Sequence, residues 1–239
     1  VTVLTASFHR EDIEAVDVLS NIRFVYVPEK PWHYSPSRVW KAIEMSLAKP
    51  LMNFAYASWQ KDAYRLAVSL QRDKPFDLIH QLTYVGFRFP GHLWKMGVPF
   101  VWGPIGGIEN TPYRLLRALG PSGMLYYTCR NLVNSVQIAV LRSPRMAARA
   151  AGPGVIAATS GVAKGVEMHL GAQASVVCEV TMPVGFEKNN PTIRQIGEPL
   201  RLVWSGQFLH GKALHLGLEA LAKSKVSEFD LELHILGDG

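Results

Sequence analysis

Short apolar runs rich in β-branched residues alternate along the chain with longer stretches of helical periodicity. Eight runs have the length and composition of strands: VTVLT, IRFVYV, FDLIHQL, VPFVW, GVIAAT, ASVVCEV, LRLVWSG and FDLELHIL. Such alternation is typical of parallel strands joined by helical crossovers, and in such folds the functional loops gather at the carboxyl ends of the strands. The pattern therefore predicts an α/β fold and directs attention to the segments that follow each strand.

One interior segment breaks this alternation. Residues 187–199, EKNNPTIRQIGEP, are polar, rich in turn formers and without apolar periodicity. We therefore predict a linker there, between a domain over residues 1–186 and the beginning of a second domain over residues 200–239. The chain opens directly on a strand-like run and stops after a strand and a Gly-Asp-Gly turn, where a helix would normally follow. We expect both domains to be incomplete.

The composition is that of a globular protein, because 48% of the 239 residues are hydrophobic and no low-complexity tract or fixed repeat occurs. The longest nearly uncharged apolar stretch, residues 97–108, is too short to span a membrane.

Cys129 and Cys178 lie far apart, which favours two buried, reduced thiols in a cytoplasmic protein over a disulfide scaffold. The eight histidines lack metal-ligand spacing, so we predict no metal site.

The basic residues are unevenly distributed. Residues 113–150 contain no acidic residue and six arginines: Arg114, Arg117, Arg130, Arg142, Arg145 and Arg149. The apolar residues of this stretch recur at helical spacing, so we predict a basic amphipathic helix. Such a helix can dock on an anionic membrane surface or a polyphosphate ligand, or it can simply present a solvated face. No nucleic-acid-binding motif accompanies the arginines, and we expect no nucleic-acid partner.

Two segments after predicted strands carry candidate binding residues. In FDLIHQLTYVGFR, the strand end is followed by polar side chains suited to binding hydroxyl groups: His80, Gln81, Thr83, Tyr84 and Arg88. Taken alone, a histidine at a strand end often hydrogen-bonds only to backbone. In VWGPIGGIENTP, three glycines leave backbone amides open ahead of Glu109 and a predicted helix start at Thr111 and Pro112. A plain tight turn is the alternative for this glycine cluster.

Four segments, in this order, carry a family resemblance: HQLTYVGFRFPGHLWKMGVPFVWGPIGGIE, VIAATSGVAKGV, LRLVWSGQFLHGKALHLGLEALAKS and LELHILGDG. Together they resemble retaining glycosyltransferases of family 4, which are hexosyltransferase-like enzymes of polysaccharide or glycolipid biosynthesis. The resemblance implies the GT-B architecture, with two Rossmann-like domains that bind the acceptor and the nucleotide-diphosphate sugar. It also implies transfer to an acceptor hydroxyl with retention, a saccharide or lipid-linked acceptor and no metal cofactor.

The resemblance assigns a donor-binding role to WSGQFLHGK, residues 204–212. The family pattern there is a glycine, an arginine and then a lysine before a helix, and the corresponding residues are Gly206, Gln207 and Lys212. Lys212 would set its ammonium against the diphosphate and stabilise the leaving group. Gln207 carries no charge and makes no bidentate clamp, which weakens this site relative to the family. Without the family, Lys212 reads as a surface lysine at a helix start.

The acceptor half also departs from the family pattern, which often ends a strand in His-x-His. Here His80 fills the first position and Leu82 the second, so Gln81, Thr83, Tyr84 and Arg88 are left to make the hydroxyl contacts. The resemblance makes His80 and Lys212 the catalytic candidates. It also makes the glycine loop a cleft-facing, acceptor-binding loop through Gly106, Gly107 and Glu109.

We expect the 239-residue chain alone to be catalytically inactive, because the family's first glycine loop and its pair of donor-binding glutamates have no counterpart in it. Two alternatives come from other classes. One is a noncatalytic α/β binding module that docks on a membrane or a partner through the basic stretch 113–150. The other is an epimerase or dehydrogenase, which the absence of a G-x-G-x-x-G motif disfavours.

Overall fold

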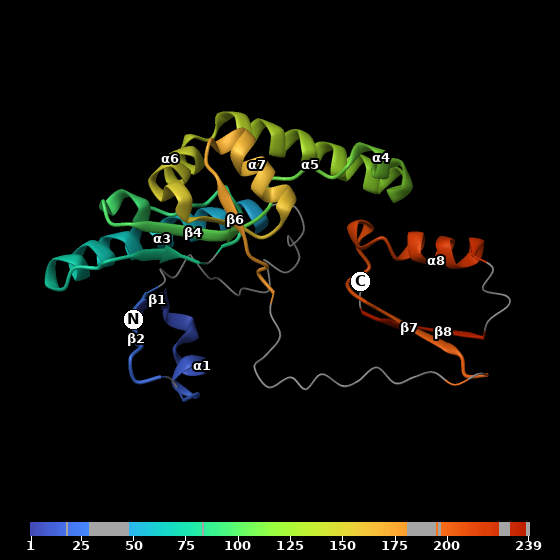
Figure 1. Cartoon of the computed structure of the whole chain (residues 1–239), viewed down its shortest axis with the longest axis horizontal. Coiled ribbons are helices and arrows are strands. Elements are labelled where there is room, and N and C mark those ends of the chain that lie inside the picture. The colour runs from blue at the N-terminus through green and yellow to red at the C-terminus, as the bar shows by residue number, and fades with distance from the viewer. Residues whose placement is uncertain are drawn as a thin grey trace. The chain divides into compact units, whose positions relative to one another are not determined.

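The computed structural model describes residues 1–17, 19–28, 48–82, 84–180, 195, 197–224 and 230–237 (Figure 1). The chain divides into two compact units. Unit 1 comprises Val1–Glu109 and Val140–Glu179, and unit 2 comprises Asn110–Ala139 and Val180–Gly239. The predicted linker over residues 187–199 falls largely outside the described residues, and the predicted domain boundaries stay a prediction.

The strand prediction is confirmed at all eight positions. The strands are β1 (Thr2–Ala6), β2 (Arg23–Val27), β3 (Ile79–Gln81), β4 (Phe100–Ile105), β5 (Val155–Ala157), β6 (Ala174–Val176), β7 (Leu200–Ser205) and β8 (Leu231–Leu236). In unit 1, β1 pairs with β2, and a second sheet has the order β3-β4-β5-β6; in unit 2, β7 pairs with β8. Every pairing is parallel, as the predicted α/β fold requires.

Helical segments connect these strands. They are η1 (Ser7–His9), α1 (Arg10–Glu14), α3 (Ala48–Asp73), η2 (Leu93–Met96), α4 (Tyr113–Leu116), η3 (Arg117–Leu119), α5 (Gly120–Val140), α6 (Arg142–Ala151), η4 (Gly152–Gly154), α7 (Ser160–Leu170), η5 (His210–Lys212) and α8 (Leu214–Lys223). In α7, Thr159 caps the first turn by accepting from the Val162 amide, and Gly171 ends the helix in the left-handed conformation. Among the described residues, no helix is long and apolar enough to cross a membrane.

The core of unit 1 lies around the four-stranded sheet. Trp102 and Ile105 of β4 are each 1% exposed, and Val155 of β5 is fully buried. Ala147 and Ala148 of α6 are also fully buried. Their small side chains let the backbone of α6 come close to its neighbours, so the core is built from large strand residues and small helix residues.

Gly103 marks a close approach between two strands. The register of β4 against β5 shifts between Trp102 and Ile105, and Gly103 has φ +135° at that irregularity. A Cβ atom on Gly103 would collide with the backbone carbonyl oxygen of Ile156 in β5. Because backbone in a sheet cannot yield as a flexible side chain can, only glycine fits here without moving the strands apart.

We expect Gly103→Ala to lower the free energy of unfolding by at least about 2 kcal/mol, since it adds both a backbone collision and an unfavourable φ. Gly86→Ala is the matched control, because a Cβ on Gly86 would meet no atom within 4 Å and its φ is not positive. Urea denaturation followed by circular dichroism measures both. Equal stability of the two variants would contradict the close approach.

The prediction of one continuous basic helix over residues 113–150 is wrong. Gly120 ends η3 with φ +71°, and the extended Leu141 separates α5 from α6, so the stretch is divided into α4, η3, α5 and α6. The cysteines are unpaired, as expected for reduced thiols, but the expectation that they are buried is wrong, because Cys129 and Cys178 are both exposed.

Helix α5 buries a polar face and exposes an apolar one. Its buried residues are Gly123, Asn131, Asn134 and Ile138. The large apolar side chains on its other side are 51–66% exposed: Leu125, Leu132, Val133 and Val136. This inverts the usual amphipathic arrangement, in which the apolar stripe packs and the polar face meets water. The polar side is buried because Asn131 and Asn134 make hydrogen bonds to Thr111 and Asn110.

Candidate functional site

The loops that follow β3 and β4 are joined at the carboxyl edge of the sheet. The amide of Gly106 donates to the Val85 carbonyl at 2.6 Å, and the amide of Phe87 donates to the Gly106 carbonyl at 3.1 Å. The Arg88 guanidinium donates to the Gly107 carbonyl at 3.4 Å. Three predicted acceptor-binding residues, Arg88, Gly106 and Gly107, are therefore neighbours, as expected for loops at one edge of a parallel sheet.

His80 is exposed, and its imidazole is fixed by the backbone of the neighbouring strand. The Nε2 atom lies 2.8 Å from the Gly103 carbonyl oxygen. Because a carbonyl oxygen can only accept, Nε2 carries the proton and donates it. In neutral His80 this leaves Nδ1 as a hydrogen-bond acceptor toward the loop edge. The alternative of a backbone-bonded histidine is thus confirmed, and the same bond orients the ring.

Gln81 lies inside the fold instead of at the open edge. It is 5% exposed, next to the 3% exposed Gln60 of α3. Both amide groups meet above Gly91, where an added Cβ would contact the side-chain oxygens of Gln60 and Gln81. Gln60 in turn donates to the Tyr56 hydroxyl. Gln81 therefore belongs to an interior polar group that supports β3.

Tyr84 also takes part in packing. Its ring stacks on Tyr56 with centroids 4.0 Å apart and meets Phe89 edge to face at 5.4 Å. It has φ +61°, and 38% of its surface remains exposed. An exposed tyrosine edge held by two rings is suited to contact a sugar hydroxyl or ring. The remaining acceptor candidate, Thr83, lies outside the described residues.

Glu109 sits at the start of α7. Its Oε2 accepts from the Thr159 hydroxyl at 3.0 Å, and a Cβ on Gly161 would collide with its carboxylate. The carboxylate thus lies at the positive end of the helix dipole, the position that an external anion would otherwise take. Glu109 is exposed, so its carboxylate can also accept from a hydroxyl of a bound ligand.

The predicted donor loop lies in unit 2, between β7 and α8. The Lys212 side chain passes over Gly206, because its Cδ is 3.8 Å from the position of a Cβ on Gly206. Lys212 is exposed, and no carboxylate pairs with it among the residues that the structure describes. Gln207 is also exposed, and its carbonyl accepts from the Leu209 amide at 2.7 Å. The sequence thus brings Gly206 and Lys212 together as the donor-loop prediction requires.

Two buried asparagines of α5 hold the segment that follows the glycine loop. Asn131 accepts from the Thr111 amide at 2.9 Å and donates to the Thr111 carbonyl at 2.8 Å. Asn134 donates to the Asn110 side chain at 2.9 Å. The two bonds of Asn131 satisfy the backbone amide and carbonyl of Thr111, and the bond of Asn134 holds the neighbouring side chain. Helix α4 begins at Tyr113, with Pro112 at its N-cap, so it starts slightly later than the predicted start at Thr111 and Pro112.

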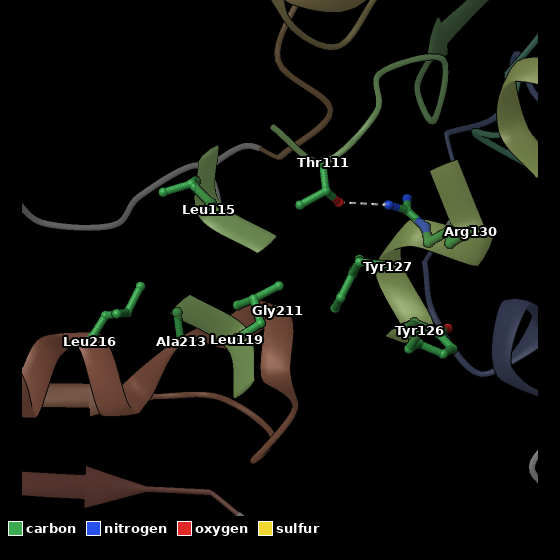
Figure 2. Close-up of a pocket in the computed structure, with 9 residues that line it drawn as sticks. All are labelled: Thr111, Leu115, Leu119, Tyr126, Tyr127, Arg130, Gly211, Ala213 and Leu216. Carbon is green, nitrogen blue, oxygen red and sulfur yellow. Dashed lines mark hydrogen bonds between the residues drawn. The ribbon is translucent and has the colours of Figure 1, made fainter. Parts of the chain in front are cut away.

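A cavity of about 370 Å³ lies in unit 2 beside this clamp (Figure 2). Its walls are mostly apolar or aromatic, with one cation: Thr111, Leu115, Leu119, Tyr126, Tyr127, Arg130, Gly211, Ala213 and Leu216. Arg130 donates to the Thr111 hydroxyl at 3.3 Å, a bond drawn in Figure 2. Sequence reasoning missed these tyrosines and the clamp, although two asparagines three residues apart in an apolar helix are a recognisable signal.

We expect Asn131→Ala to lower the free energy of unfolding by about 1–3 kcal/mol, because it leaves two part-buried backbone groups of Thr111 without the partners that Asn131 supplies. Thr128→Ala, on the exposed side of the same helix, should change it by less than about 0.5 kcal/mol. Thermal and urea denaturation of both variants provide the measurement. A neutral Asn131→Ala would mean that water replaces the amide at no cost.

Comparison with known proteins finds no family model that matches the chain and no curated protein that matches it. The family resemblance therefore remains an interpretation of the residues. Among the described residues, no group of three or more His, Cys, Asp or Glu side chains is placed to hold a metal ion.

Proposed function

We propose that this chain carries the donor- and acceptor-binding elements of a retaining glycosyltransferase of the GT-B type, an enzyme that moves a sugar from a nucleotide-diphosphate donor to an acceptor hydroxyl. The observation that carries the proposal is the donor loop. Lys212 extends over Gly206 at the carboxyl end of β7, exposed and without a carboxylate partner among the described residues. The carboxyl ends of parallel strands are where α/β proteins bind nucleotides.

The chemistry asked of this loop is neutralisation of charge. As the bond from the sugar to the diphosphate breaks, negative charge grows on the leaving phosphate oxygens. The Lys212 ammonium stabilises that charge by direct contact, while Gln207 can add one neutral hydrogen bond. Gly206 matters because a larger residue there would meet the Trp204 ring at 3.3 Å and crowd the lysine stem.

The acceptor would bind at the edge formed by the loops after β3 and β4. His80 is oriented by its bond to Gly103, and its Nδ1 can accept from a sugar hydroxyl. Glu109 offers a carboxylate that accepts from an acceptor hydroxyl, and Arg88 and the glycines bound this edge. The leaving diphosphate takes the proton of the attacking hydroxyl in a front-side displacement, so the protein chiefly positions and neutralises.

The proposal is tested by nucleotide binding to the protein. Isothermal titration calorimetry with uridine, guanosine and adenosine diphosphates should show binding of at least one of them. Lys212→Ala should weaken that binding about tenfold or more, since a hydrogen bond to a charged group contributes about 1.5–3 kcal/mol.

Lys223→Ala is the matched control, because Lys223 is an exposed lysine at the other end of α8, 3.9 Å from Glu219. It should leave nucleotide affinity unchanged. If none of the three nucleotides binds, or if the two lysine variants lose affinity equally, the donor-loop assignment is wrong.

A further inference from the structure

The exposed side of α5 forms a continuous apolar stripe. We define the α5 stripe as Leu125, Leu132, Val133 and Val136, with the exposed Cys129 between them. At about 100° of rotation per residue, Leu125, Leu132 and Val136 fall within about 40° of one another. The buried Asn134 and Ile138 fall on the opposite side of the helix. The stripe is thus a separate face, and the stability of the helix does not depend on burying it.

The stripe lies in a stretch that carries only positive charge. No acidic residue occurs between Tyr113 and Ala150, and exposed arginines precede the stripe at Arg114 and Arg117. Arg130 of α5 sits between the two faces and has no carboxylate partner among the described residues. An apolar helix face within a stretch whose charges are all positive matches a surface whose interior is hydrocarbon and whose boundary is anionic.

We propose that the α5 stripe docks this protein onto an anionic lipid bilayer, with α5 in the plane of the interface. The apolar side chains would enter the acyl boundary, and the flanking arginines would contact anionic headgroups. The proposal does not depend on glycosyl transfer, because it rests on residues outside the donor loop and the acceptor edge.

The charge argues against two other occupants. A second copy of the chain would bring like-charged arginines together, which opposes association. A nucleic acid would favour cations along the centre of the contact surface, whereas this centre is apolar. An acidic protein with an apolar surface would also complement the α5 stripe and its positive charge. The experiment therefore uses vesicles that contain no protein, so that only lipid can bind the stripe.

Flotation with vesicles of phosphatidylcholine containing about 30% phosphatidylglycerol should recover the protein with the lipid, because such vesicles combine an apolar interior with anionic headgroups. The partition coefficient should be at least about tenfold lower with phosphatidylcholine alone, and lower again at high salt. Leu125→Gln/Leu132→Gln should reduce binding to anionic vesicles at least about tenfold, because both apolar anchors are lost. Arg114→Gln/Arg117→Gln should reduce it severalfold, since each cation near the surface adds to the attraction.

Two exposed apolar residues elsewhere provide the matched control. Leu78 and Met168 are 58% and 75% exposed, and Leu78→Gln/Met168→Gln should bind as the parent does. Circular dichroism checks that each variant is folded. Equal loss in the control and stripe variants, or equal binding to neutral and anionic vesicles, would overturn the proposal. A stripe variant that changes the oligomeric state without lipid would overturn it in favour of self-association.

The two surface cysteines give a measurement that does not require a loss of binding. An environment-sensitive fluorophore on Cys129, in a Cys178→Ser background, should shift its emission to shorter wavelength when anionic vesicles are added. The same label on Cys178, in a Cys129→Ser background, should not shift. An unshifted label on Cys129 in protein that floats with the vesicles would show that another surface makes the contact and would refute the α5 stripe.

Discussion

The paired hydrogen bonds between Asn131 and the backbone of Thr111 govern much of unit 2. Thr111 follows β4 and lies in no strand, so its amide and carbonyl need other partners. One side-chain amide supplies a donor and an acceptor at 2.8 and 2.9 Å, and Asn134 holds the adjacent Asn110. Burying these amides commits one face of α5 to polar contacts, and its apolar residues are left on the other face. The exposed stripe is thus a consequence of how the loop is held.

The same constraint positions the wall of the cavity. Because Thr111 is fixed by Asn131, its hydroxyl has a defined place from which to accept a hydrogen bond from Arg130. Tyr127 lies against Gly211 from the loop before α8, where an added Cβ would collide with the tyrosine hydroxyl. A small residue at 211 is therefore needed for this approach, as one is at 103 in unit 1.

Periodicity and composition were enough to predict the strands, because runs of β-branched and apolar residues favour the extended, pleated conformation. They were not enough for residues 113–150. The apolar spacing that predicts a helical face does not say whether that face is packed, and here Leu116 and Leu119 are buried whereas Leu125 and Leu132 are exposed. Which face of α5 packs depends on the hydrogen bonds of Asn131, and their partner Thr111 lies 20 residues away in the sequence.

The site was predictable where a short motif forces proximity. The sequence places a glycine and a lysine in one short loop between a strand and a helix, and in the structure Lys212 extends over Gly206. Gln81 shows the opposite case. Its place after His80 suggested an open edge, but alternation along β3 turns His80 outward and Gln81 inward, where Gln60 meets it. Thr159 could have been predicted as a helix cap, because it precedes an apolar run at helical spacing. Its hydrogen bond to Glu109 could not have been predicted from the sequence.

Lys212 and the arginines near α5 are cations that would act on their ligands in different ways. In the proposed donor loop, Lys212 would act through one short contact between its ammonium and a diphosphate, so its effect would depend on geometry. The arginines near α5 act collectively over about a Debye length, so each contributes little and salt weakens them together. The apolar stripe between them does not respond to charge screening. Nucleotide binding and lipid docking should therefore separate by both mutation and ionic strength, since no residue of the α5 stripe lies in the donor loop.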